Sequence, residues 1–321
     1  MPVKMFITID TEEDAWDKYS TTHNPVNNIA CLPRLQDIFD RYGAVPTYLV
    51  NWPVVKNKKA NNILHNIFDK GRCEIGTHCH PWNTPPFEEE ININNSMICN
   101  LPGELIFKKI ETLHEAIVDS FKIKPVCFRA GRWGFNPKVA RSIQKLGYLV
   151  DTSITPFINW ADYMGPDFMQ ASSFSYRFAP NDVLREKAGG ALLEVPPTTG
   201  FFQKNFRLCR SLKKMTSKAL PVALHFPGVL NRAGILNFRW LSPEMSSGSD
   251  MIRLSKNFIR IGHRFLNMSF HSSSLLPGKT PFVRNQKQLD QFLNRIKMVL
   301  DFASDQNITF SPLHEAVEEI K

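Results

Sequence analysis

The feature that most constrains the fold is an alternation of short apolar runs with amphipathic stretches, repeated almost from end to end. The short runs are rich in β-forming residues, as is typical of strands, and the longer stretches carry apolar residues three or four positions apart, as helices do. The expected strands are Lys4–Ile9, Pro46–Val50, Glu74–Thr77, Val126–Phe128, Tyr148–Val150, Ala191–Val195, Val222–His225, Leu266–Phe270 and Ile308–Phe310. The expected helices are Ile29–Tyr42, Ala60–Lys70, Glu104–Phe121, Pro137–Leu146, Gln286–Phe302 and a last one near the C-terminus.

Strands that alternate with helices predict a parallel sheet covered by helices. So many strand candidates favour a closed β/α barrel over an open sheet, and a chain of 321 residues is normal for one such barrel. We therefore expect residues 1–321 to form one domain. The irregular stretches 81–102 and 156–190 are expected to be long loops, which in a compact domain tend to be functional.

The charge balance points to an anionic partner. The formal net charge is +9, and much of the excess falls in Lys204–Lys218, where basic residues alternate with Phe206 and Leu208. This segment is either a solvated surface or a patch that contacts a membrane surface. We expect an anionic lipid or a phosphate-bearing substrate as the partner, with a lipid-linked glycan as one form of that substrate, and no nucleic acid. The sequence gives no signal for the oligomeric state.

Location is indicated by what the sequence lacks. We expect no signal peptide, because the first apolar run stops at Asp10, and no transmembrane segment, because no apolar run is long enough. The six cysteines contain no CxxC pair and are expected to be free thiols. The sequence therefore predicts a cytoplasmic enzyme, peripheral at most to the inner face of the membrane.

Chemistry is expected at the carboxyl ends of the strands, where parallel β/α folds build their active sites. Five expected strands end in acids, imidazoles or a guanidinium. These candidates are Asp10 with Glu12 and Asp14, His78 with His80, Arg129, Asp151, and His271. His225 also ends an expected strand, and either lines the pocket or is a satisfied core histidine.

The pair His78 and His80 predicts a metal site. Residues i and i+2 of an extended segment point the same way with Cα atoms about 6.5–7 Å apart, so two imidazoles can bind one ion. A carboxylate from another strand end would complete a set of two histidines and one acid, with positions left for water and substrate. Glu12 and Asp14 are the candidates for that acid, with Asp10 nearby.

These segments resemble motifs of the polysaccharide deacetylase superfamily, also called NodB-homology or carbohydrate esterase family four. FITIDTEED is similar to its opening acidic motif, EIGTHCHPW to its histidine motif and FRAGRWG to its arginine–glycine motif. LVDTS stands where an aspartate motif is expected, and MSFHSSSLLPG is similar to the closing histidine motif. Two spacings depart from the usual pattern, because Thr11 separates Asp10 from Glu12 and only Cys79 separates the histidines.

The resemblance implies a distorted barrel of seven parallel strands and hydrolysis of an acetyl group from an N-acetylated sugar. It implies that Glu12, His78 and His80 bind one divalent ion, with zinc expected. It also implies that Asp10 is the general base, oriented by Arg129. The general acid would be His271, held by Asp151.

Two other classes of function remain open at this stage. One is an amidohydrolase that cleaves a cyclic amide or ureide on the same scaffold, since fold does not fix substrate. The other is a non-catalytic glycan-binding protein that has lost the metal. The resemblance favours a metal-dependent deacetylase that acts on an N-acetylated sugar or glycan precursor in polysaccharide biosynthesis.

Overall fold

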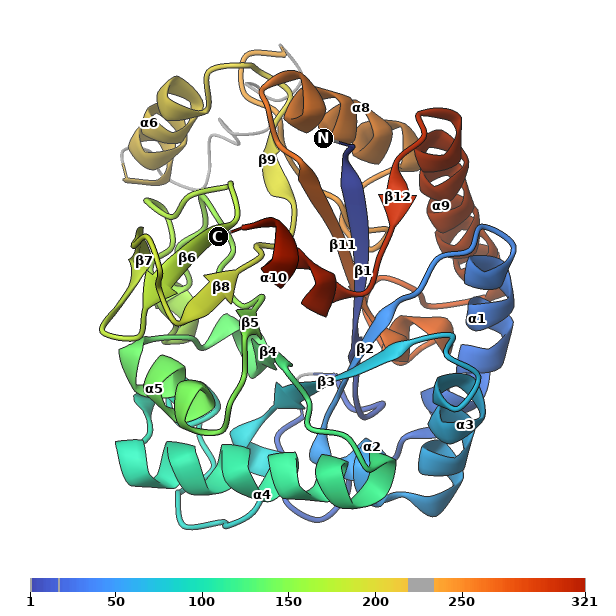
Figure 1. Cartoon of the computed structure of the whole chain (residues 1–321), viewed down its shortest axis with the longest axis vertical. Coiled ribbons are helices and arrows are strands. Elements are labelled where there is room, and N and C mark those ends of the chain that lie inside the picture. Colours follow the sequence, from blue (N-terminus) through green and yellow to red (C-terminus); the bar gives the residue numbers. More distant parts are fainter. Residues whose placement is uncertain (1, 17, 219–233, 321) are drawn as a thin grey trace.

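The computed structural model describes every residue except 1, 17, 219–233 and 321. Seven strands lie side by side and parallel, in the order β11-β1-β2-β3-β4-β5-β8 (Figure 1). Their bounds are β1 (Lys4–Thr11), β2 (Thr47–Val50), β3 (Glu74–Cys79), β4 (Cys127–Ala130), β5 (Val150–Asp151), β8 (Leu192–Glu194) and β11 (Phe265–His271). A short β12 (Thr309–Phe310) pairs with β1. The predicted arrangement of parallel strands is confirmed.

Helices cover the outside of these strands, as the alternation predicted (Figure 1). The helices of the described residues are α1 (Leu32–Asp40), α2 (Trp52–Lys56), α3 (Lys58–Phe68), α4 (Gly103–Phe121), α5 (Pro137–Lys145), α6 (Phe206–Lys218), α8 (Gly248–Arg260), α9 (Gln286–Asp305) and α10 (Ala316–Glu319). Of these, α10 lies over one end of the strands and not on their outside. Several begin at a side chain that accepts backbone N–H bonds, as Asn57 does for α3, Asn136 for α5 and Asn285 for α9. Such caps fix where each helix starts.

The ring of strands is distorted because β8 and β11 do not pair as strands. Thr198, just after β8, spans the gap instead: its amide donates to the Asn267 carbonyl at 3.0 Å, and its hydroxyl accepts from the Asn267 amide at 2.8 Å. The Asn267 side chain also donates to the Val195 carbonyl at 3.2 Å. The strands thus surround a common interior without a closed ladder of strand pairs.

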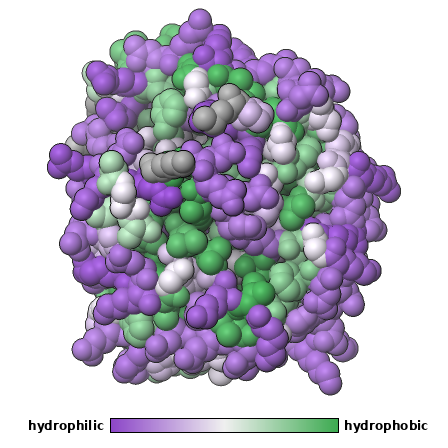
Figure 2. Space-filling view, in the orientation of Figure 1, coloured by the Kyte–Doolittle hydropathy of each residue, from purple (hydrophilic) through white to green (hydrophobic). Residues whose placement is uncertain are grey.

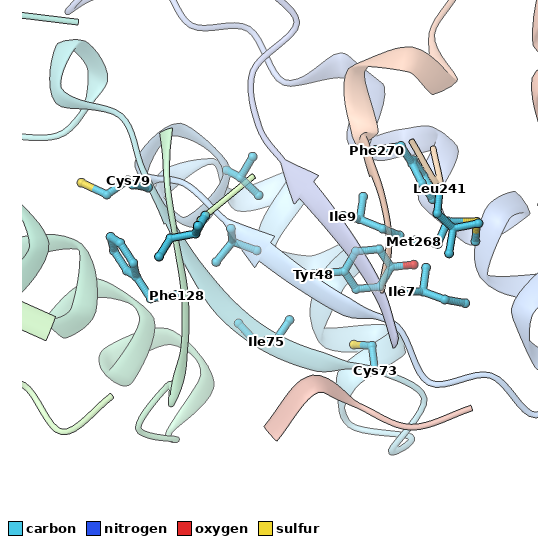
Figure 3. Close-up of a cluster of buried hydrophobic side chains, with 14 of the residues drawn as sticks. Ile7, Ile9, Tyr48, Cys73, Ile75, Cys79, Phe128, Leu241, Met268 and Phe270 are labelled. Carbon is cyan, nitrogen blue, oxygen red and sulfur yellow. The ribbon is translucent and has the colours of Figure 1, made fainter. Parts of the chain in front are cut away.

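Two apolar layers follow from the alternation of side chains along each strand. One parity faces out toward the helices, and Figure 3 shows part of this outer layer, including Ile7, Tyr48 and Phe128. The other parity faces the interior. Its apolar part is Phe6, Leu49, Cys127, Val150, Leu193 and Val195, closed by Leu313 and Ala316 from the C-terminal segment.

The interior layer leaves little room at Gly76 of β3. A Cβ built there would lie 2.6 Å from Leu49 Cδ2 and 3.0 Å from the Cys127 carbonyl oxygen, so only glycine lets Leu49 fill the space. The C-terminal segment with α10 covers this end and lies in front of the strands in Figure 1. Figure 2 shows that face from outside, where hydrophilic residues surround small apolar patches.

Two sequence predictions need correction or comment. Residues 156–190 were expected to form a loop, but they contain an antiparallel hairpin of β6 (Tyr176–Ala179) and β7 (Asp182–Glu186), which extends the sheet beyond β8. The hairpin forms the edge of the sheet, so its strands lack the long apolar run by which a central strand is recognised in a sequence. A small second sheet pairs β9 (Thr199–Phe201) with β10 (Phe238–Trp240). The expected strand Val222–His225 lies outside the described residues.

Candidate metal centre and active site

Four strand ends bring their polar side chains together at one end of the interior. Thr8 and Asp10 of β1 face inward with Arg129 of β4, although two strands separate β1 from β4 in the sheet. His78 of β3 and His271 of β11 both approach Asp10, with their Nε2 atoms 3.9 Å and 3.6 Å from Asp10 Oδ2. The carboxyl ends of the parallel strands therefore form the predicted constellation.

Glu12, His78 and His80 form a group that fits one metal ion. Glu12 Oε2 lies 2.9 Å from His80 Nε2 and 3.4 Å from His78 Nε2, and one ligand atom from each residue falls within 4.8 Å of the others. Ligands bound at about 2.0–2.1 Å and at tetrahedral to octahedral angles are separated by about 3–3.5 Å. Two imidazoles and one carboxylate, all buried, are a donor set for zinc.

The charges around this group also favour a cation. Burial alone would raise the pKa of Glu12, but the neighbouring imidazoles of His271, His78 and His80 outweigh it and hold that pKa far below its usual range. Burial would lower the pKa of His78, but the Asp10 and Glu12 carboxylates raise it instead. The group therefore favours bound positive charge, which a divalent ion would supply.

The backbone next to the histidines is shaped around His80. A Cβ built on Gly131 would lie 2.3 Å from His80 Nδ1 and 2.8 Å from the Cys79 carbonyl oxygen, so a larger residue would displace the imidazole. His80 Nδ1 has no hydrogen-bond partner among the described atoms, whereas His78 Nδ1 lies 3.1 Å from the Arg129 carbonyl oxygen. That contact fixes the His78 ring with Nε2 toward the group.

Asp10 is held by Arg129. The guanidinium Nη1 donates to Asp10 Oδ1 at 2.6 Å, while its other nitrogens donate to Thr8 and Thr152. Burial would raise the pKa of Asp10, but Arg129, and then His78 and His271, hold it below its usual range. Asp10 is therefore an ionised carboxylate, with Oδ2 3.9 Å from His78 Nε2 and 3.6 Å from His271 Nε2.

His271 is held by Glu244, a residue that the sequence did not indicate. Glu244 Oε2 lies 2.9 Å from His271 Nδ1, and its other oxygen accepts from the His271 amide and the Ser274 hydroxyl. Burial would lower the pKa of His271, but Glu244, Glu12 and Asp10 raise it to about 10. His271 is thus an imidazolium with Nε2 directed toward Asp10.

The prediction that Asp151 holds His271 is wrong in this geometry. Asp151 pairs in register with Phe128 and Glu194, which point outward, while the next residue, Thr152, faces the interior. The Asp151 carboxylate accepts instead from the Ser153 amide and hydroxyl. Burial raises the pKa of Asp151 to about 6. A one-residue shift in strand parity is enough to remove a side chain from the site.

Two further candidates fall outside the site as described. Asp14 turns away and accepts hydrogen bonds from Asn27 and Asn28, so Glu12 is the acid of the group. His225 lies outside the described residues. Glu13, by contrast, lines the site: it accepts from Trp82 Nε1 at 3.1 Å and from the side chains of Asn51 and Asn83.

A cavity of about 330 Å³ opens above these groups and is strongly aromatic. Pockets that bind small molecules are usually apolar with a few placed polar groups. Five of the six tryptophans line it. The aromatic residues are Trp16, Tyr19, Trp82, Trp133, Trp160, Tyr163, Trp240, Phe270 and Phe282. Sequence reasoning missed this lining because the residues come from five loops and from the strands β10 and β11. Three of them, Trp82, Trp133 and Phe270, stand within the quoted motifs, but no motif joins them to the others.

Comparison with known proteins identifies the fold. No protein-family model and no curated protein matches the sequence. A crystal structure titled "putative polysaccharide deacetylase" from Mycobacterium smegmatis matches with TM-score 0.55 and 15% identity, over 100% of this chain and 91% of that one. A "putative glycoside hydrolase/deacetylase" from Parabacteroides distasonis matches with TM-score 0.59 and 10% identity, over 99% and 71% of the two chains.

The chain therefore has the fold of the polysaccharide deacetylases, a distorted β/α barrel of seven parallel strands. This agrees with the resemblance that the motifs carried. At 15% and 10% identity the match concerns the fold alone. Within the described residues, no helix is both long and apolar enough to cross a membrane.

Proposed function

We propose that this protein is a metal-dependent deacetylase that removes the acetyl group from an N-acetylated sugar or glycan precursor in polysaccharide biosynthesis. One observation carries the proposal. Asp10, an ionised carboxylate, lies beside both the candidate metal group and the protonated His271, so that a proton acceptor and a proton donor adjoin one metal group. Amide hydrolysis requires this division between a proton acceptor and a proton donor.

Glu12, His78 and His80 would hold the ion, with zinc expected from the donor set. When bound, it would polarise the acetyl carbonyl and lower the pKa of a water molecule toward about 7. Asp10 accepts the proton of the attacking water, and Arg129 keeps the carboxylate oriented and ionised. His271 gives its Nε2 proton to the leaving amine, and Glu244 stabilises the charged ring until then.

The test combines metal content with acetate release. The purified protein should hold one divalent ion and release acetate from N-acetylated sugars. Glu12→Ala, His78→Ala and His80→Ala should each lose the ion and the activity. His23→Ala is the matched control, because His23 is exposed in a loop and belongs neither to the group nor to the lining of the cavity. Retention of the stoichiometric ion in any of the three variants would remove that residue from the ligand set.

The same measurements separate the two other classes of function. Ammonia or carbamate release from a cyclic amide or ureide, without acetate release from any N-acetyl sugar, would indicate an amidohydrolase. A protein without a bound ion and without turnover would be a glycan-binding protein. Two ion pairs favour catalysis over binding alone: Arg129 with Asp10, and Glu244 with His271. Glycan binding alone would not require a base and an acid that are each held by a charged partner.

We also propose that the enzyme works on the cytoplasmic side, at an anionic membrane surface where lipid-linked sugars are exposed. All six cysteines are free, which suits a reducing compartment. On α6, the exposed Arg207 and Lys214 lie beside the exposed Leu208 and Met215, because residues seven apart share a helix face. Lys213 does not contribute, since its ammonium donates to the Phe157 carbonyl at 2.8 Å.

Liposome flotation tests this location. Each basic residue near an anionic surface contributes about 1 kcal/mol, so binding should be reversible and weakened by salt. The double variant Arg207→Glu and Lys214→Glu should float less than the wild type at low salt. A matched control changes Arg141 and Lys145 to Glu on the exposed side of α5. Equal recovery of both double variants would contradict the assignment to α6.

A further inference from the structure

Arg132 is the one lysine or arginine among the residues that line the aromatic cavity, and it has no carboxylate partner among the described residues. Its guanidinium donates to the Ser96 hydroxyl and lies over the Tyr19 ring, with Cζ 5.3 Å from the ring centroid. Among the acids that line the cavity, Asp10 pairs with Arg129 and Glu244 with His271, while Glu13 accepts only from neutral side chains. The cavity therefore holds a cation with no described acid within ion-pair distance.

The backbone places Arg132 in this position at a cost. Arg132 and Trp133 both adopt left-handed conformations, with φ of 54° and 62°. Residues other than glycine rarely do so, and such conformations cluster at functional sites. Both residues directly follow Gly131, which packs against His80. The guanidinium that reaches the cavity is thus carried by a strained turn next to a candidate metal ligand.

A row of rings connects the metal group to Arg132. The His80 and Trp82 centroids are 4.1 Å apart, those of Trp82 and Tyr19 are 4.8 Å apart, and Arg132 follows over Tyr19. Arg132 therefore lies beyond the reacting group, at the far end of one aromatic wall. A sugar whose acetamido group reaches the metal group could pack its apolar face along this wall and extend toward Arg132.

We propose that Arg132 binds an anionic substituent of the substrate, so that the enzyme acts on an acidic N-acetylated sugar and not on a neutral one. The substituent is an oxyanion, either a carboxylate of the sugar itself or a phosphate attached to it. A guanidinium suits both, because its planar fork donates two parallel hydrogen bonds to such groups. This inference rests on the proposed function for the orientation of the sugar, but not for the anion contact.

The test measures binding to the metal-loaded protein with three probes that contain no amide: methyl α-glucoside, glucuronate and glucose 1-phosphate. At low salt, at least one anionic probe should bind about 10- to 100-fold more tightly than the neutral one, the usual worth of a hydrogen bond between charged groups. The anionic probe that binds more tightly identifies the substituent of the substrate as a carboxylate or a phosphate. Arg132→Gln should bring the anion to the affinity of the neutral sugar, and Arg132→Lys should keep part of the preference.

Arg185→Gln is the matched control, because Arg185 is exposed on β7, away from the cavity. It should keep the wild-type preference. Equal binding of neutral and anionic probes by the wild type, no binding of either anion, or a preference that survives Arg132→Gln would each overturn the proposal. If Arg132 only supported Tyr19 and Ser96, its loss would weaken all three probes alike. Preference for an anion without acetate release from any sugar would keep this inference and reject the proposed function.

Discussion

The two ends of the interior are built from the same strands but have opposite chemistry. On β1, Phe6 packs in an apolar layer, whereas Asp10, four residues later on the same face, belongs to a charged group. On β4, Cys127 and Arg129 show the same change two residues apart. The apolar end is closed by Leu313 and Ala316, while the charged end opens into the aromatic cavity.

The difference shows how stability and chemistry are separated along each strand. The apolar end buries side chains that need no partners, so it stabilises the fold by removing surface from water. The charged end must satisfy each buried ion with a partner, which gives little net stability but fixes positions and protonation states. Changes at one end should therefore affect unfolding, and changes at the other should affect turnover.

The largest effect is expected at the charged end. Asp10→Asn should lower turnover by about 10²- to 10⁴-fold, because an amide cannot accept the proton that the carboxylate takes. The bound ion should remain, since Glu12, His78 and His80 are untouched. Steady-state acetate release and metal analysis check both points. Asp301→Asn, at an exposed position on α9, should leave both unchanged. Normal turnover in Asp10→Asn would move the role of base elsewhere.

The opposite result is expected at the apolar end. Leu49→Ala should lower the free energy of unfolding by about 2–5 kcal/mol, because Leu49 is fully buried beside Gly76 and its removal leaves a cavity. Denaturant unfolding measures this change. Turnover per folded molecule and metal content should stay at the wild-type level. Leu208→Ala, at a side chain that is 56% exposed, should change stability by no more than about 0.5 kcal/mol. A marked loss of turnover in folded Leu49→Ala would mean that the two ends are coupled.

A smaller loss of turnover is expected when Glu244, the residue that supports His271 at the charged end, is changed. Glu244→Gln should reduce turnover by about 10- to 100-fold, since His271 would keep a hydrogen-bonding neighbour but lose its negative partner. Because Glu244 raises the pKa of His271, its loss should lower that pKa. The alkaline limb of the pH–rate profile, where the acid loses its proton, should therefore move to lower pH. Glu186→Gln on β7 is the control, and an unmoved alkaline limb would contradict the acid role of His271.

The sequence predicted the positions of the parallel strands and the polar residues at their carboxyl ends, because both depend on local patterns. Strand parity and the order of polar residues placed Asp10, His78, Arg129 and His271 at one end of the barrel, and the structure brings them together. Asp151 was placed wrongly because a two-residue strand has too few positions to reveal which parity faces inward. That the chain forms one domain stays a prediction.

What the sequence could not predict depends on contacts between distant loops. Glu244 follows β10, an edge strand of three half-buried residues, and reaches His271 through a loop with no acidic motif of its own. The aromatic lining has the same origin, since Trp133, Trp160 and Trp240 come close together only in the fold. Local patterns in the sequence indicate where strands and helices lie, whereas contacts between distant loops become visible only in the three-dimensional structure.

The smallest effect is expected where the apolar end is closed. The Thr47 hydroxyl donates to Glu74 Oε2 at 2.6 Å and accepts from the Leu313 amide at 3.0 Å, so it links β2 and β3 to the C-terminal segment. Thr47→Val keeps the shape but removes these bonds, and should lower the free energy of unfolding by about 1 kcal/mol. Hydrogen exchange should speed up in α10 and its preceding turn before it does in β1.

Thr112→Val is the control, because the Thr112 hydroxyl donates to the Lys108 carbonyl of its own helix. Because the metal group lies at the other end of the same strands, metal content and turnover should not change. A loss of bound ion in Thr47→Val would show that the C-terminal closure also sets the geometry of the charged end.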